Sequence, residues 1–139
     1  MFELSLSFGW YLWMELTFGT PPQGCRIDCS WESDTPLELT RALLMLANAE
    51  GHVDVQCSDD RRVFDIRFRR LGDRLLATVK REPKVRFRGE GHFIEMASRF
   101  VIQMRRLVAE AGSERGYKEK WGHPFPSAEL NRLESTLGR

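Results

Sequence analysis

The chain has 139 residues, of which 42% are hydrophobic and 29% are charged, and its formal net charge at pH 7 is +1. This composition is typical of a globular domain, and its 3 cysteines exclude a disulfide framework. Because a chain of this length buries about two-thirds of its unfolded surface in one core, we expect a single domain over residues 1–139.

The charge is distributed unevenly along the chain. Residues 1–60 carry 10 acidic and 2 basic side chains, whereas residues 61–88 carry 3 acidic and 11 basic side chains. Two interpretations stay open. Either the basic segment is a binding surface, or its charges pair inside the fold with those of the acidic N-terminal segment.

Alternating apolar residues predict three strands in the first part of the chain. These strands cover residues 2–8, 12–18 and 25–31, with a loop at residues 19–24. A three-residue turn over Gly9–Tyr11 would pair Phe8 with Leu12 and keep one face of the hairpin apolar. We therefore prefer it to a two-residue turn, which would mix the two faces.

Aromatic residues gather at this first hairpin. Trp10 and Tyr11 would lie at its tip, and Trp13 at the tip or on its outer face. Exposed aromatic side chains in such number are typical of a contact surface. We expect Trp10 and Trp13 to bind a partner, unless a helix or the C-terminal tail covers them.

The middle of the chain contains one helix and several strands. A capping box at Thr35–Glu38 predicts a helix from Pro36 to Glu50. Strand patterns follow at residues 52–57, 64–68, 77–80 and 85–87. A two-residue turn at Gly72–Asp73 would set Phe68 opposite Ala77 and so pair apolar residues on one face.

The longest amphipathic pattern covers Gly91–Gly112. Apolar residues recur there at steps of three and four, which predicts a helix with one wide apolar face. A short leucine-containing helix follows Ser127. Together these patterns predict an α+β fold, in which two long helices cover one face of an antiparallel sheet of about six strands and a short C-terminal helix follows.

No residue pattern indicates a catalytic centre or a metal site. Cys25, Cys29 and Cys57 do not have the spacing of metal ligands, either among themselves or with the three histidines. We therefore expect no enzymatic activity, no metal and no cofactor. Glu3 and Glu15 interrupt the apolar N-terminal stretch, which is typical of neither a signal peptide nor a membrane span, so we expect a cytoplasmic protein.

The basic hairpin within residues 61–88 is the strongest candidate for a binding surface. Strand alternation places five of its cations on outward faces: Arg67, Arg69, Lys80, Arg86 and Arg88. Arginine binds phosphate and carboxylate groups in bidentate fashion. The phenylalanines of this segment fall on the opposite face, which argues against stacking on nucleic-acid bases and leaves phosphate contacts or an acidic protein partner.

Ile102 is a further candidate for partner binding. It falls on the polar side of the long helix, flanked by Arg99, Arg105 and Arg106. An apolar centre with a rim of arginines has the composition of a small interface. Single exposed isoleucines are also common on protein surfaces that bind nothing.

The C-terminal stretch GYKEKWGHPFPSAELNRLE follows the strand-rich half and the long helix. In this arrangement the chain resembles small bacterial proteins of unassigned function, some of which are immunity proteins of polymorphic-toxin systems. The resemblance implies a protein that binds and blocks a cognate toxin domain, and it carries over no functional residue. A charge-polarised surface would suit such a role, because electrostatic steering speeds the capture of a partner.

Two functions follow as expectations. The first is a non-enzymatic, immunity-type inhibitor that occludes a cognate protein. The alternative is a nucleic-acid-binding accessory protein that uses the hairpin of residues 61–88.

Overall fold

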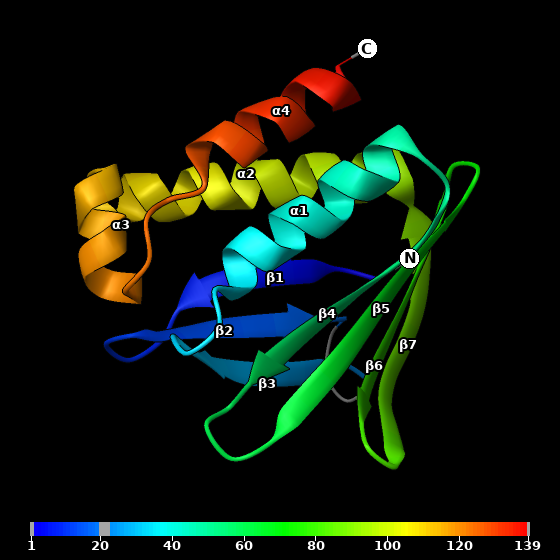
Figure 1. Ribbon diagram of the computed structural model, residues 1–139, viewed down its shortest axis with the longest axis horizontal. Coiled ribbons are helices and arrows are strands. Elements are labelled where there is room, and N and C mark those ends of the chain that lie inside the picture. The colour runs from blue at the N-terminus through cyan, green and yellow to red at the C-terminus, as the bar shows by residue number, and fades with distance from the viewer. Residues whose placement is uncertain (1, 20–22, 139) are drawn as a thin grey trace.

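The computed structural model describes residues 2–19 and 23–138, so residues 20–22 of the predicted loop lie outside the described part. Within these ranges, the chain forms four helices and seven strands, and the strands make two antiparallel sheets (Figure 1). The predicted α+β class is confirmed. The prediction of a single sheet is wrong, because the strands divide into sheets of 3 and 4 strands.

The first sheet has the strand order β1-β2-β3. Its strands are β1 (Leu4–Phe8), β2 (Trp13–Phe18) and β3 (Cys25–Ser30). Phe8 lies opposite Met14 rather than Leu12, so the predicted register is wrong by two residues. A shift by two residues keeps each side chain on its face of the sheet, and the apolar face is buried as expected.

The second sheet has the strand order β4-β5-β6-β7. Its strands are β4 (Gly51–Ser58), β5 (Val63–Leu71), β6 (Arg74–Arg81) and β7 (Lys84–His92). The predicted pairing of Phe68 with Ala77 is confirmed. β7 is longer than the short strand expected, and its register shifts where it passes Val79 and Lys80. The two sheets meet where β3 lies next to β4 without ladder pairing.

Helices cover the inner faces of both sheets. They are α1 (Thr35–Asn48), α2 (Phe93–Ala111), α3 (Glu114–Trp121) and α4 (Ser127–Leu137). α1 lies against β4 and β5, α2 lies against β1, β6 and β7, and α4 packs on both of these helices (Figure 1). The prediction that the two long helices cover one face of a single sheet is therefore wrong, because α2 contacts strands of both sheets. In the described part of the chain, no helix is long and apolar enough to cross a membrane.

α2 also protects the free edge of β1. The side-chain amide of Gln103 donates to the Leu4 carbonyl at 2.6 Å and accepts from the Leu6 N–H at 2.8 Å. These are the two hydrogen bonds that one residue of a neighbouring strand would make with this edge. A side chain thus takes the place of a further strand and covers an edge that would otherwise invite pairing with another chain.

The three cysteines lie in the core. Cys29 on β3 and Cys57 on β4 are 0% and 2% exposed, and Cys25 is 8% exposed. The adjacent Cys29 thiol, together with burial, raises the pKa of Cys57. Burial also raises the pKa of Cys25, although the nearby Arg86 guanidinium opposes this change.

We therefore expect all three thiols of the native protein to react slowly with Ellman's reagent, because the thiolate is the reactive form. Cys25 should react first, since it is the most exposed of the three and is the one beside a cation. Absorbance readings with mass-spectrometric assignment of the labelled cysteine would test this order. Native-state labelling of Cys29 or Cys57 as fast as that of Cys25 would contradict it, and full labelling in denaturant is the control.

Candidate functional site

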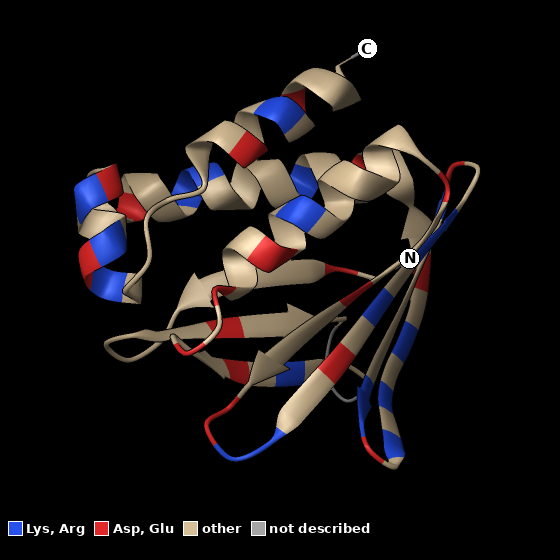
Figure 2. Cartoon of the chain, in the orientation of Figure 1, with Lys and Arg blue, Asp and Glu red and all other residues tan. Residues whose placement is uncertain are grey.

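The outer face of the second sheet forms a shallow hollow of about 800 Å³. Ten residues line it: Ser33, Glu38, Asp54, Gln56, Asp65, Arg67, Thr78, Lys80, Glu82 and Arg88. Three of these side chains are basic and four are acidic. The basic hairpin of the sequence is therefore one wall of a hollow of mixed charge, and Figure 2 shows both charge signs along β5.

Two of the lining residues form an internal ion pair. Arg67 on β5 donates to both carboxylate oxygens of Asp54 on β4, at 2.8 and 3.0 Å. The guanidinium holds the pKa of the Asp54 carboxyl below its usual range. In the adjacent row, Gln56 donates to Asp65 at 2.8 Å. Arg67 is thus already paired, which leaves it less available to a partner than the sequence suggested.

The remaining predicted cations differ in their surroundings. Arg69, Lys80 and Arg88 are exposed on the outer face, and none of them takes part in an ion pair with a described residue. Arg86 lies at the register shift of β7 and approaches Cys25 at the edge of the first sheet. Arg86 is exposed, as predicted, but its proximity to Cys25 and to the register shift gives it surroundings that differ from those of Arg88.

The acidic segment of residues 1–60 and the basic segment of residues 61–88 form few ion pairs with each other. Among the described residues, the Asp54–Arg67 contact is the one ion pair that joins residues 1–60 to residues 61–88. Arg74 instead pairs with Glu90 within the second sheet at 2.5 Å. Internal pairing with the acidic segment thus accounts for Arg67, whereas the interpretation as a binding surface stays a prediction for Arg69, Lys80 and Arg88.

A second surface is formed by the aromatic loop, which we define as residues 9–12 between β1 and β2. Trp10 is 88% exposed and Tyr11 is 70% exposed. Neither α3 nor the C-terminal tail buries them, so the possibility that these elements cover both side chains is ruled out. Trp13, the first residue of β2, is half-buried on the outer face of the first sheet.

The backbone of the aromatic loop is held at both ends. Gly9 N–H donates to the Trp13 carbonyl at 3.0 Å, and Trp13 N–H donates to the Trp10 carbonyl at 2.8 Å. Leu12 has a φ of 67°, a left-handed conformation that is strained for a bulky residue.

Leu12 is kept in this conformation by two neighbours from distant parts of the chain. Its N–H donates to the Lys120 carbonyl at the end of α3 (2.9 Å), and its carbonyl accepts from the Trp31 N–H (3.1 Å). The loop therefore presents its aromatic side chains on a backbone fixed by tertiary contacts.

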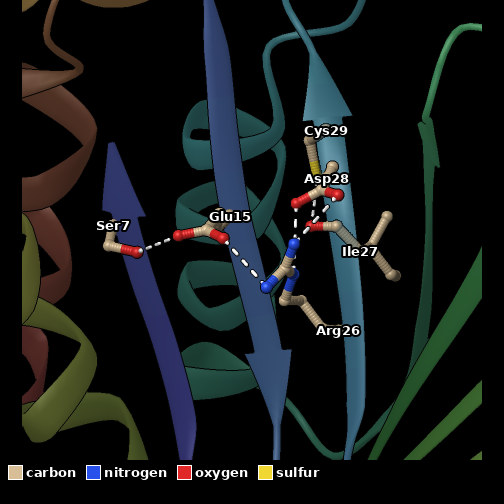
Figure 3. A network of polar contacts seen from close by, with 6 residues as sticks. All are labelled: Ser7, Glu15, Arg26, Ile27, Asp28 and Cys29. Carbon is tan, nitrogen blue, oxygen red and sulfur yellow. Dashed lines mark hydrogen bonds and ion pairs between the residues drawn. The ribbon is translucent and has the colours of Figure 1, made fainter. Parts of the chain in front are cut away.

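Two hollows flank Trp10. One, of about 540 Å³, is lined by Trp10, Trp13 and the charged residues of the outer face of the first sheet, and the other, of about 380 Å³, is lined by Tyr11 and α3. Figure 3 shows the charged network beside the first hollow, in which Arg26 lies between two carboxylates. It pairs with Glu15 at 3.3 Å and with Asp28 at 3.3 Å.

Trp31 extends the aromatic surface, and sequence reasoning missed it. The alternation predicted that Trp31 shares the buried face of the third strand with Cys29. β3 instead ends at Ser30, and Trp31 is 48% exposed next to His123. The strand pattern of the sequence has no signal for this change, since the Trp31 N–H still donates to the Leu12 carbonyl at 3.1 Å while the side chain lies exposed.

Ile102 lies apart from both surfaces. It is 51% exposed on α2 and lines a hollow of about 290 Å³ together with Arg99 and Arg106. The predicted arginine rim is present in part. This hollow is smaller than those of the other two surfaces. It is also lined by Gln103, whose side-chain amide already forms two hydrogen bonds with β1 and is therefore not free to contact a partner.

The described residues contain no group of three or more histidine, cysteine, aspartate or glutamate side chains placed to hold a metal ion. Comparison of the chain with protein-family models, with curated proteins and with solved structures found no match to it.

Proposed function

We propose that this protein is a non-enzymatic binding domain that recognises another protein and blocks it, with the aromatic loop as its anchor. The exposure of Trp10 and Tyr11 on a fixed backbone carries this proposal. Tryptophan and tyrosine dominate the binding energy of protein interfaces. A loop that is already ordered before binding loses little conformational entropy on association.

The charge layout supports a protein partner over a nucleic acid. A nucleic acid brings a phosphate with every nucleotide, and single-stranded nucleic acid requires aromatic side chains beside the cations that hold the backbone. Here the exposed aromatic residues lie at the first sheet. Lys80 and Arg88, which form no ion pair with any residue that the structure describes, lie on the second sheet among acidic residues.

The specific form of this proposal is an immunity-type inhibitor that occludes a toxin domain. The resemblance of the chain to small bacterial immunity proteins suggests this form. Co-expression with the product of the adjacent gene, scored by growth of the host, would test it.

The general proposal is tested by replacing both Trp10 and Tyr11 with alanine. Because both side chains are exposed, the free energy of unfolding should stay within about 0.5 kcal/mol of the wild-type value. We expect the wild-type protein to retain one stoichiometric protein from a nuclease-treated lysate of its native cells, and the double variant to retain at least about tenfold less.

A matched control keeps this result specific. Arg74 and Glu90 form an exposed ion pair on the second sheet, away from the aromatic loop, and their double replacement by alanine should leave capture unchanged. Equal capture by the Trp10/Tyr11 variant and the wild type would refute the role of the aromatic loop. Capture that disappears with nuclease treatment would instead favour the nucleic-acid alternative.

A further inference from the structure

We infer that the hollow beside Trp10 and Trp13 receives an arginine side chain of the partner protein, which stacks on an indole and points towards two carboxylates. This inference rests on the proposed function and names the chemistry that the partner brings to the aromatic loop. The hollow has a volume of about 540 Å³ and is lined by Gly9, Trp10, Trp13, Glu15, Arg26 and Asp28.

The aromatic side of the hollow is open to a ligand. Trp10 is 88% exposed and Trp13 is half-buried. In the described part of the chain, neither indole pairs with a second aromatic ring or lies under a cation. A Cβ at Gly9 would lie 3.5 Å from the Trp13 Cβ and 3.7 Å from the Glu15 Cγ, so the glycine leaves this space free. The face of an indole attracts cations.

The charged side of the hollow carries more negative than positive charge. Glu15 on β2 lies directly across the ladder from Asp28 on β3, and like charges in this arrangement repel each other. Arg26 is the one cation among the lining residues, and it pairs with both carboxylates at 3.3 Å (Figure 3). One guanidinium for two carboxylates leaves a negative charge that a second cation would balance.

The surroundings of the hollow have the same sign of charge. Within the described residues 2–19 and 23–31, Glu3 is a third acidic residue and Arg26 is the only basic one. Lys120 on α3 lines the other hollow that flanks the aromatic loop. A cationic group of the partner therefore meets complementary charge here, whereas a carboxylate or a phosphate would be repelled.

Arginine fits both sides of the hollow better than lysine does. Its planar guanidinium stacks on aromatic rings and directs several N–H donors at carboxylates, whereas the lysine ammonium is compact and strongly hydrated. Arginine is also enriched in protein interfaces, from which lysine is depleted. We therefore expect a peptide with one arginine to bind more tightly than the same peptide with lysine.

A synthetic probe tests the inference on the isolated protein. The probe is the blocked peptide acetyl-Gly-Ser-Arg-Ser-Gly-amide, and the matched control has citrulline, which has the same shape but no charge, in place of arginine. In two-dimensional ¹H–¹⁵N NMR, the arginine peptide should shift the indole N–H signals of Trp10 and Trp13 saturably. The indole signal of Trp121, which is fully buried, should stay unchanged. Glu15→Gln/Asp28→Asn should bind the peptide at least about fivefold more weakly.

Two further variants separate specific binding from a general charge effect and from misfolding. Asp73→Asn/Glu82→Gln removes two negative charges from exposed turn residues of the second sheet and should bind the arginine peptide as the wild type does. Trp10→Ala removes an exposed side chain without disturbing the core and should bind the peptide at least about threefold more weakly.

Capture of the native partner separates this inference from the proposed function. Glu15→Gln/Asp28→Asn should also capture the partner at least about fivefold less than the wild type does. If this variant captures normally while Trp10→Ala/Tyr11→Ala does not, the inference is overturned and the proposed function stands. If the arginine peptide binds as expected but capture does not need Trp10 and Tyr11, the role of the aromatic loop in the proposed function is refuted instead.

Three outcomes of the titration would overturn the inference. One is that the citrulline or the lysine peptide binds as tightly as the arginine peptide. Another is that Glu15→Gln/Asp28→Asn binds as the wild type does, or no more weakly than Asp73→Asn/Glu82→Gln. A third is that a dT oligonucleotide shifts the same indole signals at a lower concentration than the arginine peptide does, which would assign the hollow to nucleic acid.

Discussion

Replacement of Asp34 by alanine is expected to lower the free energy of unfolding by about 2–4 kcal/mol. The Asp34 carboxylate has two structural tasks. It accepts a hydrogen bond from the Leu37 N–H at 3.5 Å and so caps α1. It also accepts from the Trp121 indole N–H at 2.9 Å, and Trp121 is fully buried. Alanine would leave the helix without its cap and a buried donor without an acceptor.

Two companion variants identify the cause of this loss. Asp34→Asn keeps an oxygen acceptor for both donors and should cost less than about 1 kcal/mol. Trp121→Phe removes the indole donor, so Asp34→Ala should cost less in that background, with a coupling free energy of about 1 kcal/mol or more. Urea unfolding of the four proteins of the cycle measures this value. Equal losses for Asp34→Ala and Asp34→Asn would contradict the hydrogen-bond explanation.

The consequence of Asp34→Ala for binding follows from the position of Trp121. This residue ends α3, and the neighbouring Lys120 carbonyl accepts from the Leu12 N–H in the aromatic loop. If Trp121 shifts, the contact that holds Leu12 in its left-handed conformation is weakened. We therefore expect Asp34→Ala to reduce partner capture even at temperatures at which the variant remains folded, whereas Asp34→Asn should preserve capture.

Replacement of Gln103 by methionine is expected to lower the free energy of unfolding by about 2–4 kcal/mol. Methionine keeps the length and the apolar stem of the side chain but can neither donate nor accept a strong hydrogen bond. The Leu4 carbonyl and the Leu6 N–H would lose their partner at a partly buried edge of the first sheet. Their loss is costly because unpaired backbone groups away from water pay their full desolvation penalty.

Hydrogen exchange supplies a local measurement for this prediction. The amide of Leu6 should exchange faster in Gln103→Met, since its acceptor is gone. Arg106→Met is the matched control: it makes the same new side chain on α2, in the same hollow, and should change stability by no more than about 0.5 kcal/mol. A Gln103→Met protein with wild-type stability and an unchanged Leu6 amide would show that water or another group satisfies this edge.

Local features of the fold could be predicted from the sequence, because they depend on neighbouring residues. The turn at Gly72–Asp73 has a length and an alternation that allow one register, and that register is observed. The helix ending near Gly112 was predicted from its apolar period. Within the predicted helix of residues 36–50, Leu39, Leu43 and Leu46 recur at helical spacing, and all three are buried on α1.

The candidate site was only partly predictable. Alternation along β5 and β6 placed Arg67, Arg69 and Lys80 on an outer face, but it could not show that Asp54 already pairs with Arg67. That pair depends on which strand lies beside β5. The proximity of Arg86 to Cys25 depends on how β7 lies against the first sheet, for which the residue pattern has no distinct signal.

By itself, the sequence determined the α+β class, the helices α1, α2 and α4, the hairpin at Gly72–Asp73, and the apolar face of most strands. These properties depend on residues a few positions apart, whose periodicity reports directly on burial. Only the tertiary structure decided that the strands divide into two sheets, that Gln103 completes the edge of β1, and that Trp10 and Tyr11 stay exposed. The reason is physical: these outcomes depend on contacts between residues far apart in the chain, such as Leu12 with Lys120, and no local pattern encodes them.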